Sequence, residues 1–120
     1  MSKINPNGVG LKNGNIFGFD VNEENAEVVI IPVPWDATSS YGTGSSNGPD
    51  AILEASTQLD FVHPELKKAW KQKIFMLPIS KEWKEINEQL RFSMMDYHHC
   101  LESGEELSDD LKALQKTVNE

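Results

Sequence analysis

The clearest pattern along the chain is a short apolar run at 28–33, VVIIPV, followed by a long polar loop. Runs of this length and β-branched composition are typical of strands buried on both faces of a parallel sheet. The loop at 34–48 is rich in Gly, Ser, Thr and Pro, and Pro49 then stands at the favoured first position of a helix over 49–56. Strand, loop and helix in this order form the first half of a β–α–β unit, in which ligand sites form at the carboxyl end of the strand.

Hydrophobic periodicity predicts the remaining elements. A second apolar run at 74–79, IFMLPI, predicts another strand, and a short helix is predicted before it at 65–73. Ser80 and Gly104 are residues expected to cap the two ends of a long helix. Its apolar stripe comprises Trp83, Ile86, Leu90, Met94, Tyr97 and Leu101. Ser108 is expected to cap a last helix, whose apolar face comprises Leu111, Leu114 and Val118.

These elements predict an α/β chain in two segments. Residues 1–27 form a polar N-terminal arm and turn. Residues 28–120 form an incomplete α/β domain made of the strand–loop–helix unit, the second strand and two helices. The apolar pattern of the last helix still continues at Glu120, which indicates that this domain is the first part of a longer one.

Composition and charge exclude several classes of partner. The chain has 120 residues and a formal net charge of −8, and its basic residues are scattered among the acids. We therefore expect binding neither to nucleic acid nor to an anionic membrane surface. No apolar run approaches the ~20 residues that span a bilayer. Cys100 is the single cysteine, so an intrachain disulfide is impossible, and a cytoplasmic location fits this usage.

The glycines of the loop suggest phosphate binding, but their spacing differs from the known motifs. Gly42, Gly44 and Gly48 follow G-x-G-x-x-x-G, whereas a dinucleotide-binding loop needs G-x-G-x-x-G and a P-loop needs Gly-Lys. The residues favour glycines that only permit a tight backbone path. A small nucleotide- or anion-binding domain, using the start of the helix at 49–56, stays as an alternative.

Two further groups of residues carry candidate chemistry. Asp36 follows Trp35 directly after the first strand, and its carboxylate could accept hydrogen bonds from a cationic substrate or from the N–H groups of its own loop. The residues alone favour the second role. His98 and His99 adjoin Cys100, but neighbouring helical residues point about 100° apart, so surface histidines are favoured over a zinc site.

Three segments together resemble the start of the ureohydrolase family, which comprises the arginases, agmatinases and formimidoylglutamases. They are IPVPWD at 31–36, YGTG at 41–44 and NGPDAILEAS at 47–56. Members of the family typically carry a strand that ends in a Pro-aromatic-Asp-like turn, a Gly-rich loop and then Gly-Pro-x-x-Ile-Arg-x-Ala-Ser. Here Leu53 replaces the usual Arg, and Ser40 and Tyr41 stand where many relatives carry an Arg before the glycines.

The resemblance implies the N-terminal portion of a three-layer α/β/α fold around a mainly parallel sheet. It also implies an enzyme that uses two manganese ions to activate water against a small guanidino or formimino substrate, and a homo-oligomer, trimer or hexamer. The relatives' ligand motifs, Gly-Gly-Asp-His, Asp-Ala-His-x-Asp and Asp-x-Asp, do not occur in these 120 residues. We therefore expect no catalytic residue and no metal site in this chain by itself.

In the parent fold, the loop would line the rim of the active-site cleft or a subunit contact. The candidates for the substrate rim are Trp35, Asp36, Tyr41, Gly42 and Gly44. Gly48, Pro49 and Ser56 are expected to serve the structure. The alternative from another class is a non-catalytic interaction or regulatory module that kept the same strand, loop and helix.

Overall fold

The computed structural model describes residues 8–120, so the first seven residues of the predicted arm lie outside the described residues. These residues divide into two compact units, each built from two separate stretches of the chain. The first unit contains residues 8–32 and 49–79, and the second contains residues 33–48 and 80–120. Both units are described separately below.

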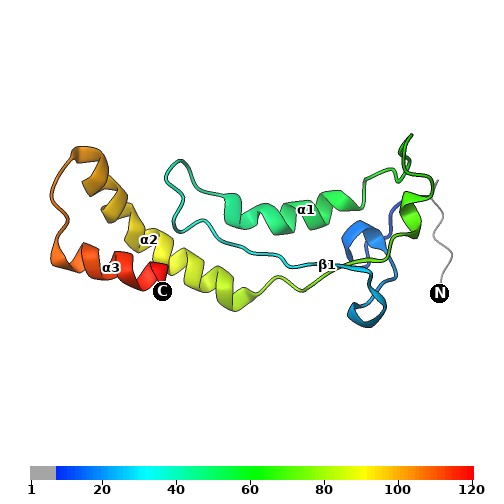
Figure 1. The fold of residues 1–120 in the computed structure, drawn as a ribbon, viewed down its shortest axis with the longest axis horizontal. Helices are drawn as coiled ribbons and strands as arrows, with labels where there is room; N and C mark the ends of the chain where they lie inside the picture. The colour runs from blue at the N-terminus through cyan, green and yellow to red at the C-terminus, as the bar shows by residue number, and fades with distance from the viewer. Residues whose placement is uncertain (1–7) are drawn as a thin grey trace. The chain divides into compact units, whose positions relative to one another are not determined.

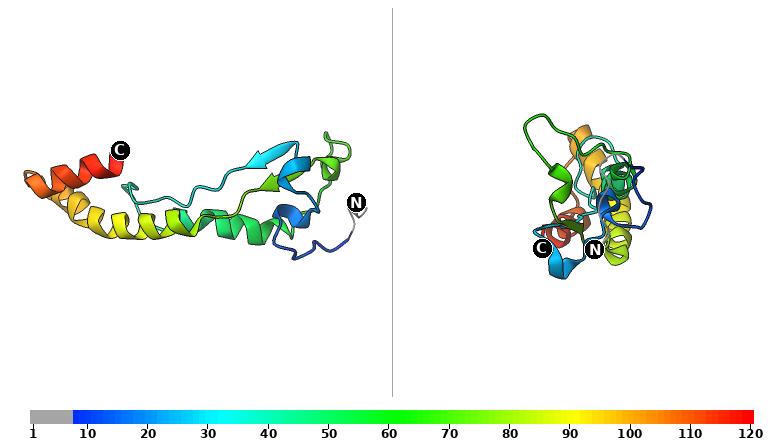
Figure 2. Two further views of the ribbon diagram at one scale, coloured as in Figure 1. Left: turned by 90° about the horizontal axis from the view of Figure 1, so that it is seen from below. Right: turned by 90° about the vertical axis from the view of Figure 1, so that its right-hand side faces the viewer.

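The first unit holds a two-stranded parallel sheet. Strand β1 (Val28–Ile30) pairs with strand β2 (Ile74–Met76), with Val28 opposite Ile74 and Ile30 opposite Met76, as the two adjacent arrows in Figure 2 show. The Leu77 N–H donates to the Ile30 carbonyl at 2.9 Å and extends the ladder by one bond. The predicted parallel pairing and the α/β class are confirmed.

Both strands are shorter than the apolar runs at 28–33 and 74–79 that predicted them. Prolines interrupt each run, and a proline cannot donate to a strand ladder. The expected burial of the first strand on both faces is also wrong for this chain. Val28 and Val29 are 45% and 43% exposed, because β2 is the only strand paired with β1 in the described sheet.

Helix α1 (Gly48–Ser56) begins one residue before the predicted start, and Pro49 lies in its first turn. The buried Ser56 hydroxyl donates to the Leu53 carbonyl at 2.7 Å and accepts the Phe17 N–H at 2.8 Å. Ser56 thus joins the helix end to the N-terminal segment. Ile52 of the same helix is 60% exposed.

An aromatic cluster packs the N-terminal segment against the chain that follows α1. The rings of Phe17 and Phe61 meet edge to face with centroids 4.9 Å apart, and the Phe19 ring lies 4.8 Å from that of Phe61. Ile16, in the short turn η1 (Ile16–Gly18), is 2% exposed. These apolar contacts give the first unit its own small core.

The second unit is organised by helices α2 (Lys81–Ser103) and α3 (Asp109–Asn119), and Figure 1 shows α3 folded back along α2. Ser80 and Ser108 cap the two helices, since their hydroxyls accept the N–H of the third helical residue in each. Gly104 ends α2 in the left-handed conformation, with φ of 70°. The predicted caps of both helices are confirmed.

The stripe predicted on α2 is only partly buried. Met94 is 5% exposed, but Trp83 and Leu101 are 56% and 50% exposed. The most buried residue of the helix is instead Asn87, which the apolar pattern passes over. No helix among residues 8–120 is both long enough and apolar enough to cross a membrane.

The prediction of a short helix at 65–73 is wrong. Only the single turn η4 (Ala69–Lys71) forms there. Lys68 takes a left-handed conformation with φ of 66°, which a continuous right-handed helix cannot include. The remaining short turns are η2 (Glu23–Asn25) and η3 (Ser45–Asn47).

Two glycine substitutions test these helix ends in opposite directions. Gly104→Ala forces a side chain into a left-handed backbone, and we expect it to lower the free energy of unfolding by about 1 kcal/mol. Gly48→Ala is the matched control, because Gly48 has a helical φ of −53° and open space around an added Cβ. It should raise the free energy of unfolding by roughly 0.5 kcal/mol. Denaturant unfolding followed by circular dichroism measures both, and equal effects would contradict the assigned caps.

Candidate functional site

The loop that follows β1 is closed by one buried carboxylate. Asp36 is 3% exposed, and its Oδ2 accepts the Gly44 N–H at 2.7 Å. The same oxygen accepts the Ser46 N–H at 3.4 Å and the Ser46 hydroxyl at 3.2 Å. The carboxylate therefore joins the two ends of the segment 36–46.

Asn87 of α2 binds the same loop from the other side and is fully buried, with 0% exposure. Its Nδ2 donates to Asp36 Oδ1 at 2.8 Å. Its Oδ1 accepts the backbone N–H groups of Asp36 and Ala37, at 2.7 and 2.8 Å. One side-chain amide thus binds the Asp36 carboxylate and the backbone N–H groups of residues 36 and 37.

Arg91, the single arginine of the sequence, lies one turn further along α2. Its Nη1 is 3.7 Å from Asp36 Oδ2, and its side chain is 33% exposed. The guanidinium supplies a positive charge beside a carboxylate that has little contact with water. We call Asp36, Gly44, Ser46, Asn87 and Arg91 the Asp36 network.

The hydrogen bonds of the network keep the buried Asp36 carboxyl group ionised. Burial alone would raise the pKa of this carboxyl group, but hydrogen bonds from Asn87, Gly44 and Ser46 outweigh burial and lower the pKa from 3.8 to about 2. Asp36 is therefore ionised at neutral pH. A carboxylate offers about four acceptor positions, and the network already directs hydrogen bonds and an ion pair to both oxygens.

The structure thus realises one of the two roles considered for Asp36, acceptance of hydrogen bonds from its own loop. Its role as a substrate contact stays a prediction. Trp35, the other candidate beside it, donates from Nε1 to the Thr38 hydroxyl at 3.2 Å. Its ring meets Trp83 of α2 edge to face, with centroids 6.1 Å apart.

The other rim candidates lie in or next to the loop tip, residues 40–43. Tyr41 is 96% exposed. Gly42 and Gly44 have φ of 70° and 121°, which side-chain-bearing residues rarely adopt, so both positions require glycine for their backbone path. The Ser39 hydroxyl donates to the Gly42 carbonyl at 2.9 Å. The loop is consequently ordered at its base and presents its aromatic tip to solvent.

Sequence reasoning missed Asn87 and Arg91. The available signal was a lone amide on the inward side of a helix, since Asn87 lies one turn after Trp83 and two turns before Met94. A buried polar side chain at such a position needs hydrogen-bond partners.

The described residues do not fit a dimanganese centre. Within residues 8–120, no group of three or more His, Cys, Asp or Glu side chains lies close enough together to hold a metal ion. Cys100 is 7% exposed, and its thiol contacts the carbonyls of Glu105 and Glu106 at 3.5 and 3.6 Å. His98 contacts the Tyr97 ring edge to face.

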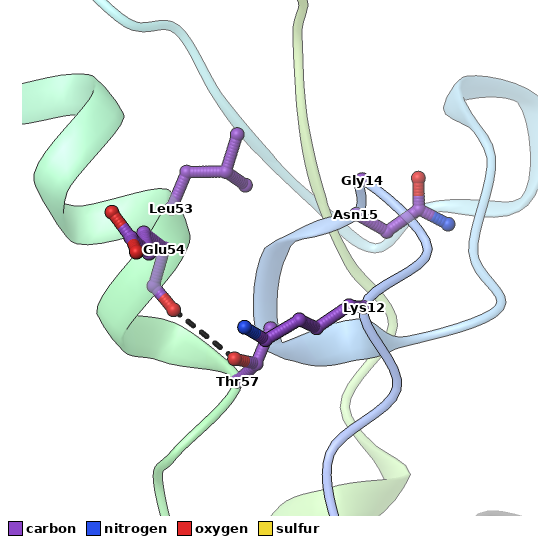
Figure 3. Close-up of a pocket in the computed structure, with 6 residues that line it drawn as sticks. All are labelled: Lys12, Gly14, Asn15, Leu53, Glu54 and Thr57. Atoms are coloured by element: carbon purple, nitrogen blue, oxygen red, sulfur yellow. Dashed lines mark hydrogen bonds between the residues drawn. The ribbon is translucent and has the colours of Figure 1, made fainter.

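The first unit contains a cavity of about 290 Å³ beside the end of α1. It is lined by Lys12, Gly14, Asn15, Leu53, Glu54 and Thr57. Figure 3 shows the Lys12 side chain extending toward Thr57, whose hydroxyl donates to the Glu54 carbonyl at 3.1 Å. The sequence pattern gave no indication of this cavity. Its lining includes one cationic side chain, Lys12, and one carboxylate, Glu54.

The family model described as "Arginase: Arginase family" matches residues 26–116, which include both strands and the entire Asp36 network. The chain belongs to the arginase family. The predicted resemblance to the ureohydrolases is thereby confirmed, together with the arginase-like α/β class. The matched residues also include the strand, loop and helix from which the resemblance was first drawn.

Two relatives are similar to a 41-residue stretch of the chain. Over 41 residues, or 34% of this chain, the sequence is 51% identical to an N(1)-aminopropylagmatine ureohydrolase of Synechocystis sp.. It is 46% identical over 41 residues to a protein of the same name from Thermus thermophilus. These matches cover 13% and 14% of the relatives' lengths. No solved structure matches the chain significantly.

The lowered pKa of Asp36 predicts a specific dependence of stability on pH. The folded-state pKa of about 2 lies below the ordinary 3.8, so the stabilisation is present above pH ~4 and is lost as the pH falls toward 2. The shift corresponds to about 2 kcal/mol. Between pH ~5 and ~2, wild-type protein should lose about 2 kcal/mol more unfolding free energy than Asp36→Asn.

Urea unfolding at a series of pH values measures this difference. Asp60→Asn is the matched control, because Asp60 is exposed and lies outside the network. It should follow the wild-type pH dependence. If Asp36→Asn also follows the wild-type pH dependence, the carboxylate is not held ionised by the network.

Proposed function

We propose that this chain forms the N-terminal part of a manganese-dependent ureohydrolase, which releases urea from a guanidino substrate or a related amide from a formimino substrate. The observation that carries the proposal is the arginase-family match across residues 26–116. The names of the relatives favour the guanidino class, and within it a compound such as N(1)-aminopropylagmatine. The manganese ions would supply activated water for attack on the guanidino carbon.

The catalytic ligands belong, in this proposal, to a part of the protein other than residues 8–120. The described residues gather no group that could hold a metal ion, and the relatives are much longer than the matched segment. We also propose that the whole protein is a homo-oligomer and is located in the cytoplasm. The buried free thiol of Cys100 fits the second of these, since reducing compartments keep thiols free.

This chain's own contribution would be the loop that the Asp36 network holds. Asp36 is 3% exposed, and its two carboxylate oxygens already accept hydrogen bonds from Gly44 and Asn87, so we assign contact with substrate to the exposed tip rather than to the carboxylate. Tyr41 is the tip residue with the largest exposed side chain, and an aromatic ring can contact both the alkyl stem and the cationic end of a guanidino compound. Gly42 and Gly44 would shape the backbone beside it.

Metal content and urea release test the proposal directly. We would measure both on this 120-residue chain and on the longest reading frame that contains it, with agmatine and N(1)-aminopropylagmatine as substrates. Bound manganese with urea release in the longer protein, and neither in the 120-residue chain, is the expected result. If the longer protein shows neither, the enzyme proposal fails and a non-catalytic interaction module of the same fold takes its place.

Removal of the Tyr41 ring tests the role of the loop tip. In the longer protein, Tyr41→Ala should raise KM about fivefold and leave kcat nearly unchanged, because loss of a ring contact costs about 1 kcal/mol of binding. Thr43→Ala, an exposed change in the same tip, is the control and should leave KM at the wild-type value. An unchanged KM in Tyr41→Ala would remove Tyr41 from the substrate rim.

A further inference from the structure

Most of the hydrogen-bonding positions of the Asn87 side chain bind the loop that follows β1. An amide side chain has two donor hydrogens and two acceptor lone pairs, and three of these four bond to residues 36 and 37. The residue has 0% exposure, so water does not share these bonds. The amide is therefore explained by the loop and not by the helix.

The chemistry of the contact also requires an amide opposite a carboxylate. A leucine at position 87 would leave two backbone N–H groups and one carboxylate oxygen without partners, and each unpaired buried group costs free energy. An aspartate at position 87 would keep its bonds to the two N–H groups. Its second oxygen would then lie 2.8 Å from Asp36 Oδ1, where two negative charges repel each other.

The contact determines where the loop begins and where it closes. Asn87 holds the backbone at residues 36 and 37 against α2, and the carboxylate that Asn87 orients then binds Gly44 and Ser46. The tip at 40–43 lies between these two fixed points. Its largest side chain, Tyr41, is 96% exposed and therefore depends on the base of the loop for its placement.

We infer that Asn87 is the positioning residue of this loop, and that Asn87 and Asp36 form a reciprocal amide–carboxylate pair that sets the direction in which the tip is presented. The pair is defined by its hydrogen bonds alone. Its effect on substrate binding rests on the proposed function. Because the contact needs one amide and one carboxylate, the two side chains should be exchangeable between the positions.

The exchange is tested with Asp36→Asn, Asn87→Asp and the double variant D36N/N87D. In the double variant, the carboxylate at 87 accepts the two loop N–H groups and the amide hydrogens of residue 36. The amide oxygen at 36 then accepts from Gly44 and Ser46. Arg91 stays near the negative charge, because it follows position 87 by one helical turn.

Two measurements report the result. They are the midpoint of thermal unfolding and the circular dichroism band that arises from coupling between the indole rings of Trp35 and Trp83. Trp35 and Trp83 lie 6.1 Å apart at 75°, a geometry that gives a coupled circular dichroism band sensitive to the base of the loop. Each single variant should lower the unfolding midpoint by about 8 °C and weaken the band. The double variant should recover most of both signals. Trp83→Phe identifies the band, and Gln89→Glu controls for an added negative charge at an exposed position of α2.

The inference would be overturned if the losses of unfolding midpoint and band intensity in the two single variants simply added in the double variant. It would also be overturned if each single variant had the midpoint and band of the wild type. Measurements on the longer protein distinguish failure of this inference from failure of the proposed function. There, Asn87→Asp should raise KM for agmatine several-fold, and D36N/N87D should return it toward wild type. Rescue of the band and midpoint without urea release in any version would refute the function and keep the pair. Urea release without rescue would refute the pair and keep the function.

Discussion

A buried carboxylate is stable only where hydrogen bonds replace the water it has lost, and Asp36 meets this condition within its own loop and one helix. Its Oδ2 receives the Gly44 N–H at 2.7 Å, which requires the backbone of Gly44 to take a φ of 121°. A glycine at position 44 therefore allows a backbone N–H group to be directed at the carboxylate. This gives Gly44 a role that does not involve a phosphate, in agreement with the departure of the loop from the nucleotide-binding motifs.

The features predicted correctly from sequence are those decided by neighbouring residues. A serine cap acts on the third residue after it, and a C-terminal glycine acts on the last turn, so Ser80, Gly104 and Ser108 were identifiable. The helix expected at 65–73 failed because apolar spacing says nothing about the left-handed conformation of Lys68. The pairing of Asp36 with Asn87 joins residues 51 positions apart, and no local rule connects them.

The first apolar run has the composition of a buried strand, but its side chains are exposed. Val28, Val29, Ile31 and Val33 have the composition of a strand covered on both faces, yet they are between 43% and 70% exposed. Such an apolar surface at a sheet is normally covered by further strands or helices. The matched segment spans 13% of the Synechocystis relative. Both observations support the proposal that this chain works as one part of a larger arginase-family structure.

The Asp36 network divides the loop into a fixed base and a free tip, and this division bears on how substrate choice could vary in the family. Residues at the base satisfy one another, so a change there leaves a buried charge or N–H group unpaired. The Tyr41 side chain of the tip is 96% exposed, so a change of this side chain leaves no buried group unpaired. Ser40 and Tyr41 stand where the resemblance to the ureohydrolases leads us to expect an arginine. In the proposed function, a new side chain at the tip would therefore alter the contact with the guanidino substrate while the hydrogen bonds at the base of the loop stay intact.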